Sequence, residues 1–496
     1  MRASESPGKA PQAGIETHHA RPVLGICVAM GFTTLLDQTI FGLALPRLRD
    51  SLHASPDELQ LIVSVYSIAF GIALVPAGRL GDLIGRRLLF LVGLVMFSGF
   101  SLVGGLADTA QVLIVARLLQ GVGAGMINTQ VLGLIQDLFR GDSQARALGR
   151  YASAGGLAGL AGPVLGGLIL ALTPAEVGWR LMFLVNVPFG VVIFYLALRH
   201  LPHGRASAGR LSVDGMGLIL LSAVTLFSML ATLQQADTLL SARTSLLAAM
   251  GAAALFLLWE RHYQRRGGSP ILGAGLTGSP GYVLGTLVAM FQFAGGTTFG
   301  MVTTLLFLDG LKTGPLLFAL LSIAPAVGMM VSSARSWRFA ARFGRMSVVA
   351  AIAAYMAALA LLGAGVLLLP ARGILLLYPL LGLLLGASGG LIHAPNQAMT
   401  LAEVGAGEGR GTAAGFFQLS QRLASSIGMS WGIGLFLDGA KAHGGLLAWR
   451  HAFAEALVLI LGLLGAALAA ALGDWLRRRR IHAMRVGALG GATGLD

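Results

Sequence analysis

The sequence has little of what a water-soluble protein of its length needs on its surface. Only 11% of its 496 residues are charged, whereas 55% are apolar. It contains one cysteine, Cys27, so an internal disulfide is excluded. It also lacks an HExxH motif, a phosphate-binding loop, paired carboxylates and any loop long enough to fold alone. We therefore expect neither an enzyme nor a receptor with a soluble sensor domain, and we expect no cofactor or metal site.

Apolar runs of about 20 residues, the length that crosses the hydrocarbon core of a bilayer, recur along the whole chain. They fall into groups of six, two and six, which predicts an all-α integral membrane protein with fourteen transmembrane helices. The runs lie near 22–45, 59–79, 88–106, 111–133, 147–172, 180–199, 213–233, 240–258, 281–308, 314–334, 347–369, 373–398, 412–437 and 451–474. The predicted parts are an N-terminal six-helix bundle at 22–200, two linking helices at 213–258 and a C-terminal six-helix bundle at 281–474.

Basic residues are distributed unevenly between the predicted loops. The chain has 35 Lys and Arg against 21 Asp and Glu, and most of the basic residues fall on the side that carries both termini. The positive-inside rule places that side in the cytoplasm of a multi-pass inner (plasma) membrane protein. Residues 1–21 are then a cytoplasmic arm and 475–496 a basic cytoplasmic tail. Topology and contact with anionic membrane lipid explain the positive charge without a nucleic-acid partner.

A short charged turn separates the second and third predicted spans. Gly78 and Gly85 permit a tight reversal, and Asp82 can reach Arg86, which Arg87 follows. This segment resembles the signature loop of the major facilitator superfamily, although Leu83 stands where that family often has a basic residue. The resemblance implies that Asp82, Arg86 and Arg87 latch neighbouring helices on the cytoplasmic side during alternating access. The alternative is a simple charged turn that obeys the positive-inside rule.

Two ionisable residues lie inside predicted spans at similar depth. Asp37, in the first span, and Arg117, in the fourth, lie roughly 12 and 9 Å from the outer ends of their helices at 1.5 Å per residue. A charge at this depth is costly, so a function in proton coupling is the default hypothesis. The alternative is a fixed buried ion pair that holds the two helices together. The segments around both residues also resemble superfamily motifs, although Gly42 stands where the family usually has Asn.

The fifth span carries a face of small residues and one proline. The residues are Gly155, Gly159, Gly162, Pro163, Gly166 and Gly167. Small residues let a partner helix approach closely, and proline bends a helix, so ordinary helix packing would use the same pattern. The segment resembles the antiporter motif of the superfamily, which implies export.

The segment that opens the sixth span, from Trp179 to Gly190, is close to the pattern of the fourteen-span drug:proton antiporters of the EmrB and QacA type. The extra pair of central helices agrees with this resemblance, which implies the major facilitator fold. We expect a structural role for this segment, with Trp179 at the outer membrane interface. The turn at 338–345 only echoes the signature loop and lacks its Asp.

A substrate site is expected between the two bundles, near the middle of the membrane. Candidate lining residues, chosen by depth, are Gln120, Asn128, Gln130, Phe291, Gln292, Phe293, Asn396 and Arg422. The alternative for Arg422 is a role in helix packing, and the lone His393 of the twelfth span is expected to make a hydrogen-bonded helix contact. A wall that is mostly apolar, with one deep carboxylate, favours small lipophilic substrates that are monocationic, neutral or weakly acidic.

The sequence thus favours a proton-coupled antiporter that exports small lipophilic compounds by alternating access, as in multidrug efflux. A dedicated exporter of one metabolite, such as a siderophore or a fatty acid, would carry the same motifs. Besides substrate, protons and membrane lipid, the resemblance implies a periplasmic adaptor protein as a partner where the host has two membranes.

Overall fold

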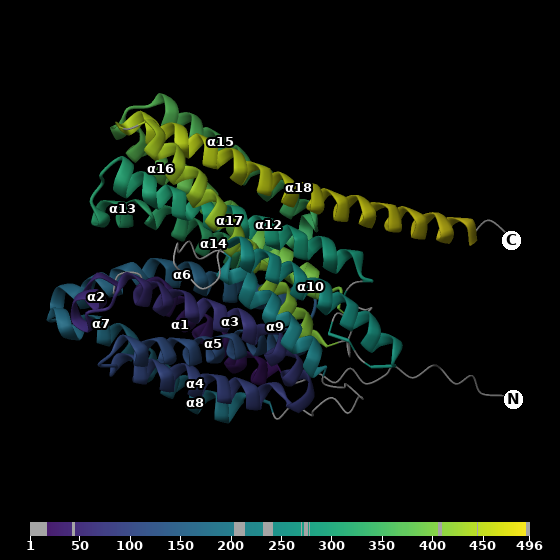
Figure 1. The fold of residues 1–496 in the computed structure, drawn as a ribbon. Coiled ribbons are helices and arrows are strands. Elements are labelled where there is room, and N and C mark those ends of the chain that lie inside the picture. The colour runs from purple at the N-terminus through teal and green to yellow at the C-terminus, as the bar shows by residue number, and fades with distance from the viewer. Residues whose placement is uncertain are drawn as a thin grey trace, which may run out of the picture.

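The computed structural model describes residues 17–41, 45–202, 214–231, 242–268, 270–271, 276, 278–404, 409–443 and 445–492, and these are almost entirely helical. The first half of the chain forms one bundle, drawn in purple and blue in Figure 1. Its helices are α1 (Thr17–Phe41), α2 (Leu45–Leu52), α3 (Pro56–Ile84), α4 (Arg86–Gly105), α5 (Ala110–Leu138), α6 (Asp142–Leu172), α7 (Ala175–Leu184) and α8 (Asn186–His200).

The second half forms a similar bundle, drawn in green and yellow in Figure 1. It contains α12 (Pro280–Leu305), the π-helical turn η1 (Leu306–Gly310), α13 (Pro315–Leu321), α14 (Ile323–Phe343), α15 (Met346–Leu368), α16 (Ala371–Leu401), α17 (Arg410–His443) and α18 (Gly445–Ala492). Two further helices, α9 (Gly215–Leu230) and α10 (Ala242–Arg265), pack on each other, and α9 also packs on α3 and α17.

Local chemistry explains where several of these helices begin. The Ser55 hydroxyl accepts a hydrogen bond from the Glu58 amide, while the Ser55 amide donates to the Glu58 carboxylate at 2.9 Å, so α3 starts with a reciprocal capping box. Between α3 and α4, Gly85 has a φ angle of 105°, which side-chain-bearing residues rarely adopt. The tight reversal that the sequence predicts in this turn is confirmed.

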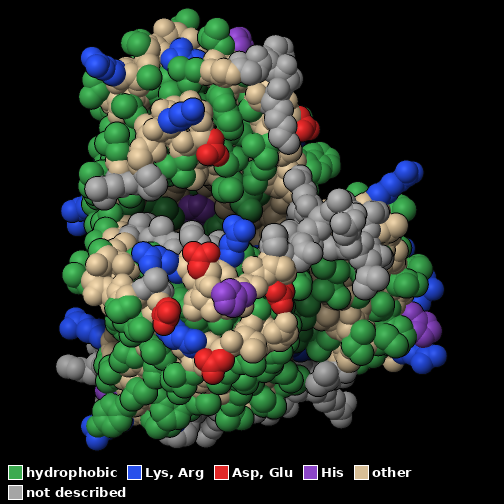
Figure 2. Space-filling model, turned by 60° about the vertical axis from the view of Figure 1, so that its left-hand side comes forward, with side chains coloured by type: hydrophobic (Ala, Val, Ile, Leu, Met, Phe, Trp, Pro, Cys, Tyr) green, Lys and Arg blue, Asp and Glu red, His purple; other side chains and the backbone are tan. Residues whose placement is uncertain are grey.

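One end of the molecule, which we call the basic end, carries the segments 78–87, 140–146, 335–345, 410 and 477–480. The two halves contact each other at this end through α3 with α17 and α6 with α14. At the other end, which we call the opposite end, the two bundles diverge (Figure 1), and Figure 2 shows a hollow between them. Helix α1 begins and α18 ends at the basic end. The structure is therefore closed at the basic end and open at the opposite end.

The described part of the chain contains 12 helical stretches that are long and apolar enough to cross a membrane. Of the remaining predicted spans, α9 is apolar but has only 16 residues, and α17 has 34 residues but lower apolarity. The all-α membrane fold is confirmed, whereas the count of fourteen spans stays a prediction.

Several predicted spans differ in detail from the observed helices. The predicted span 180–199 is broken between α7 and α8 at Val185, and the span 314–334 is broken between α13 and α14 at Ser322. Helix α18 continues without a break past 474, so the basic tail is helical as far as Ala492. Residues 1–16 of the predicted N-terminal arm, and Gly42, lie outside the described residues.

Candidate functional site

Asp37 lies at the centre of a buried polar cluster inside the first bundle. Its carboxylate accepts hydrogen bonds from Arg117 at 3.0 Å, Gln120 at 3.1 Å and Asn186 at 2.7 Å. The Arg117 guanidinium also donates to the Gln120 side-chain oxygen at 3.0 Å. Asp37 is only 2% exposed. The cluster therefore joins α1, α5 and α8 through a buried, hydrogen-bonded ion pair.

Aromatic rings surround the cationic side of this pair. The Arg117 guanidinium carbon lies 4.3 Å from the Phe41 ring centroid and 4.1 Å from the Tyr66 ring centroid. Tyr66 in turn lies 6.3 Å from the Phe70 ring, over which the Arg422 guanidinium lies at 3.5 Å. Since Arg422 belongs to α17, a continuous chain of contacts connects Asp37 to the second bundle.

The break between α7 and α8 places Asn186 in this cluster. Pro188 has no backbone N–H to donate within the helix, and the chain restarts as α8 immediately after Val185. Asn186 then points inward and donates to Asp37 and also to the Ser101 hydroxyl at 3.0 Å. Sequence reasoning treated this segment as structural only and missed Asn186. The one available signal in the sequence was a polar residue, Asn186, two residues before Pro188 inside an otherwise apolar span.

Trp179, from the same segment, is buried inside the protein, so the expectation that its side chain anchors in the membrane interface is wrong. Its side chain is fully buried and its ring lies edge-on to Phe183 at 6.2 Å. Helices α2 and α7 pack against each other, and Trp179 belongs to a small apolar core that includes Leu48 and Leu113. The interface preference of Trp is therefore overridden by a local apolar core.

The signature-loop residues join the two bundles at the basic end. The Asp82 carboxylate accepts hydrogen bonds from the backbone amides of Gly411 at 3.0 Å and Thr412 at 3.1 Å, at the N-terminus of α17. Arg86 pairs with Asp82 at 2.9 Å and also with Asp137. A carboxylate at a helix N-terminus is favoured both by the free amides and by the helix dipole.

Glycines from the same loop and from α6 allow the bundles to approach closely. A side chain at Gly78 would collide with the Gly411 carbonyl of α17. In α6, a Cβ at Gly156 would lie 3.1 Å from the Met330 amide of α14, and one at Gly162 would collide with Thr39 of α1. A Cβ at Gly155 would lie 3.1 Å from the Leu35 side chain. By contrast, Gly159 and Gly167 have open space beside them. Gly155 and Gly162 thus pack α6 against α1, and Gly156 packs it against α14 of the second bundle.

Other motif residues have local roles. Arg87 donates a hydrogen bond to the Leu198 carbonyl of α8 at 2.7 Å, within its own bundle. Gly166 is buried in α6. Pro163 lies within the same helix, which continues past it to Leu172.

The second bundle contains a charge cluster that the sequence analysis missed. Arg345, at the start of α15, pairs with Asp474 of α18 at 2.6 Å and donates to Asn396 of α16 at 2.7 Å. Burial lowers the pKa of the Arg345 guanidinium, and the Asp474 carboxylate counteracts that shift. Arg478 donates to Asp474 at 3.1 Å and to Glu403 at 2.6 Å. The missing Asp of the 338–345 turn is therefore replaced by a carboxylate from another helix.

Replacing Asp474 by Asn is expected to lower the melting temperature of the purified protein substantially. Arg345 would remain buried without its closest counter-charge, and breaking a buried pair on one side costs about 3–5 kcal/mol. The exposed Asp438 of α17 provides a matched control, because its replacement by Asn removes the same charge from a solvated position. Equal melting temperatures for the two variants would contradict the structural role of the pair.

The candidate cavity residues do not all face one space. Gln130 donates to the Ala77 carbonyl at 2.8 Å, and Asn396 donates to the Gly285 carbonyl at 2.8 Å, so both are buried in helix contacts towards the basic end. Gln120 belongs to the Asp37 cluster.

Of the remaining candidates, Asn128 and Arg422 contact the other bundle. The Asn128 side chain accepts from the Tyr151 hydroxyl at 2.9 Å, and its backbone carbonyl accepts from Gln418 of the second bundle at 3.4 Å. Phe293 and His393 contact each other edge to face at 4.5 Å, and both are partly exposed. Phe291 is half-buried, and Gln292 of the same helix is buried. Arg422 is half-buried over Phe70.

Comparison with known proteins places this arrangement in a family. The profile of the Major Facilitator Superfamily matches residues 27–429. A probable actinorhodin transporter of Streptomyces coelicolor is 31% identical over 331 residues, which are 66% of this chain and 57% of that protein. A tetracenomycin C resistance and export protein of Streptomyces glaucescens is 33% identical over 43% of this chain and 38% of its own length. A cephamycin export protein of Amycolatopsis lactamdurans is 32% identical over 56% of this chain and 57% of its own length.

The matches thus span less than two thirds of the length of these relatives, which are named for transport or export and not for an enzymatic reaction. Among solved structures, the proton:xylose symporter XylE has a TM-score of 0.61 at 16% identity, with 92% of this chain and 96% of that chain covered. The human organic anion transporter MFSD10 has a TM-score of 0.58 at 17% identity, with 90% and 99% covered. These two likenesses concern the fold. Because the matched profile includes helices of both bundles, this chain belongs to the major facilitator superfamily.

Proposed function

We propose that this protein is a proton-coupled antiporter that exports small lipophilic compounds. The observation that carries the proposal is the buried cluster around Asp37, which combines a carboxylate deep in the first bundle with contacts that lead to the second bundle. A charge buried at this depth is costly, and a fold retains such charges mainly where they move ions or substrates.

The geometry supports a specific role for the ion pair. When Asp37 is ionised, it holds Arg117 by a hydrogen bond at 3.0 Å. Protonation of Asp37 would remove this attraction and leave the guanidinium between the Phe41 and Tyr66 rings, where cation–π attraction still stabilises it. A small shift of Arg117 would then act on Tyr66, Phe70 and the Arg422 contact. In this way protonation can bias the packing of the two bundles.

The proposed direction is export from the cytoplasm. The basic end is the cytoplasmic side under the positive-inside rule, which puts both termini in the cytoplasm of the inner membrane. The hollow at the opposite end (Figure 2) would then be the exit to the outside. The relatives named for actinorhodin, tetracenomycin C and cephamycin support export of antibiotic-like compounds.

The substrate range separates the two forms of this proposal. A multidrug exporter of the fourteen-span type would accept many unrelated lipophiles, whereas a dedicated exporter would accept one metabolite. A relative named as a multidrug resistance protein, from Mycobacterium tuberculosis, is 30% identical over 60% of this chain, and favours the first form. A periplasmic adaptor, where the host has two membranes, belongs to the same proposal.

Proton release from reconstituted vesicles tests the function. Wild-type protein is inserted in liposomes with an imposed proton gradient, and a pH-sensitive dye reports proton movement as lipophilic cations, neutral dyes, aromatic polyketides and fatty acids are added. We expect a substrate-triggered proton flux for several unrelated compounds. A flux for one class alone would favour the dedicated exporter, and substrate movement that is independent of the gradient would overturn proton coupling.

A further inference from the structure

A cavity lies between the two bundles at the basic end, away from the Asp37 cluster. It has a volume of about 220 Å³. The first bundle contributes the end of α5 and the start of α6, and the second bundle contributes the end of α16 and the start of α17. The lining residues are Gln136, Arg140, Gly141, Gln144, Leu401, Ala402, Val404 and Arg410.

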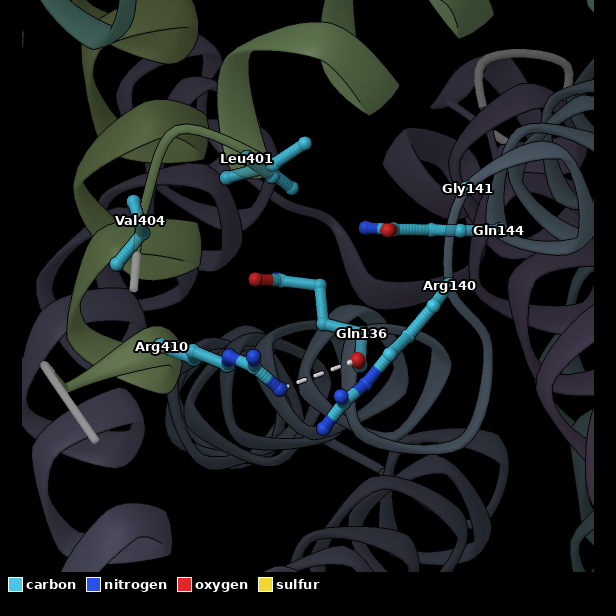
Figure 3. Close-up of a pocket in the computed structure, with 8 residues that line it drawn as sticks. Gln136, Arg140, Gly141, Gln144, Leu401, Val404 and Arg410 are labelled. Carbon is cyan, nitrogen blue, oxygen red and sulfur yellow. Dashed lines mark hydrogen bonds between the residues drawn. The ribbon is translucent and has the colours of Figure 1, made fainter. Parts of the chain in front are cut away.

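The Gln136 side chain points into this cavity without a partner. Figure 3 shows it extending towards the side of the cavity that Leu401 and Val404 line, while the guanidinium ends of Arg140 and Arg410 lie near the Gln136 backbone carbonyl. The residue is 3% exposed, and neither its side-chain nitrogen nor its side-chain oxygen has a hydrogen-bond partner in the described part of the chain. A buried amide normally satisfies both groups, and leaving them unpaired costs about 1–3 kcal/mol each. The amide therefore indicates a missing ligand that both accepts and donates hydrogen bonds.

Two guanidinium groups from different bundles face the same space. The Arg410 guanidinium donates to the Gln136 backbone carbonyl at 3.3 Å and pairs with Asp137 at 3.4 Å. Both distances are long for a hydrogen bond. The hydrogen bonds of Arg140 with described residues involve only its backbone, so its guanidinium has all its donors available.

The two charged residues that line the cavity are both arginines. The nearby carboxylates, none of which lines the cavity, are Asp137, which Arg86 and Arg410 share, Asp82, which Arg86 and the α17 amides share, and Asp142 in the first turn of α6. With Arg140 added, three arginines oppose three carboxylates, but only the arginines Arg140 and Arg410 face the cavity itself. The N-terminus of α6 at Gly141 has no side-chain cap and adjoins the cavity, with Asp142 in the first turn of the helix, so its backbone amides are additional donors at this site.

We infer that this cavity is a binding site for a phosphate group, held between Arg140 and Arg410. Guanidinium groups bind the oxygens of a phosphate bidentately, and free helix amides add further donors. The Gln136 amide nitrogen would donate to a phosphate oxygen, and its oxygen would accept from a P–OH group or from a hydroxyl on the esterified alcohol. The volume exceeds the roughly 30 Å³ of one water several-fold, so a phosphate group has room.

A bound phosphate group would link the two bundles. Arg140 belongs to the first bundle and Arg410 to the second, so the site exists only while the basic end is closed. The ligand therefore stabilises that conformation and no other, because a ligand shifts a conformational equilibrium only through its differential affinity. The phosphate comes either from a free phosphate compound or from the headgroup of an anionic phospholipid in the adjacent leaflet.

Thermal unfolding of the purified full-length protein tests the site. In detergent, inorganic phosphate is titrated at constant ionic strength against chloride. In parallel, the protein is placed in nanodiscs of phosphatidylcholine alone or with phosphatidylglycerol. We expect a saturable rise in melting temperature of roughly 2–4 °C with at least one of the two ligands. A rise with inorganic phosphate assigns a free phosphate compound, and a rise with phosphatidylglycerol alone assigns the lipid headgroup.

The variants identify the place of binding. Arg140→Gln and Arg410→Gln are expected to abolish the rise in melting temperature. Gln136→Leu, which fills the space with an apolar side chain of similar size, is expected to raise the ligand concentration at the midpoint of the rise at least tenfold. Arg335→Gln removes the same charge from an exposed position at the basic end and should keep the full rise. No rise with either ligand, or an equal rise in wild type and all three cavity variants, would overturn the proposal. Because the assay measures no transport, this outcome is independent of the proposed function.

Discussion

Replacing Asp37 by Asn is expected to abolish substrate-triggered proton release while leaving a folded protein. Asn keeps an oxygen that can accept from Arg117 or Asn186, but it cannot be ionised. Losing a positioned proton-transfer group reduces the rate by about 10²–10⁴-fold. Arg117 would retain its contacts with Phe41 and Tyr66, which limit the cost of its lost counter-charge. The measurement is dye-reported proton flux in the vesicle assay described above.

Two further variants separate proton coupling from a fixed structural ion pair. Asp108→Asn removes a carboxylate that is 88% exposed at the opposite end and paired with Arg180 only at the surface, so its flux should equal that of wild type. The double variant Asp37→Asn with Arg117→Gln removes both buried charges and should recover melting temperature relative to Asp37→Asn alone. If it also recovered proton flux, or if Asp37→Asn retained wild-type flux, Asp37 would be a structural residue.

Introducing a side chain at Gly149 is expected to shift the protein away from the conformation described here. A Cβ at this position of α6 would lie 2.6 Å from the Ser333 carbonyl of α14, which is backbone and cannot rotate away. Overpacking of this kind costs typically about 1–3 kcal/mol. This energy changes the ratio of two conformations by roughly 5–150-fold. Gly149→Val should therefore open the basic end and close the opposite end.

Distances between spin labels across the opposite end measure this shift. The chain has a single cysteine, so Cys27→Ser provides a background in which Glu176→Cys of α7 and Arg372→Cys of α16, both exposed, can be labelled. Gly149→Val should shorten the label distance. Gly159→Val, which places the same side chain in α6 with no atom within 4 Å of its Cβ, should leave the distance distribution unchanged. A wild-type distribution in Gly149→Val would show that close packing at this glycine does not control the closure.

Features that depend on short stretches of chain were predictable from the sequence. The apolar runs predicted most of the membrane helices, because the thickness of the bilayer imposes their length. The contact between Asp82 and Arg86 follows from their spacing of four residues, and the reversal at Gly85 follows from its lack of a side chain. The Asp37 and Arg117 pair was predictable because both charges lie at one depth, where each needs a partner.

Features that depend on helix rotation were not predictable in the same way. Depth alone suggested that Gln130 and Asn396 line a cavity. The rotation of their helices instead directs both side chains towards a neighbouring helix, where each donates a hydrogen bond to a backbone carbonyl. Asn186 reaches Asp37 only because the chain breaks and restarts at Val185, which resets the direction of its side chain.

The sequence by itself thus determined that this chain is a helical membrane protein with one deep ion pair and a charged turn, because these features follow from local composition and spacing. Only the tertiary structure decided which charges meet across the chain. Asp474 pairs with Arg345 through the packing of α18 against α15, and Arg140 and Arg410 face one cavity because the two bundles close on each other at the basic end. Such pairings depend on the relative positions of helices that are far apart in the chain, and the spacing of residues along the sequence does not predict which residues pair.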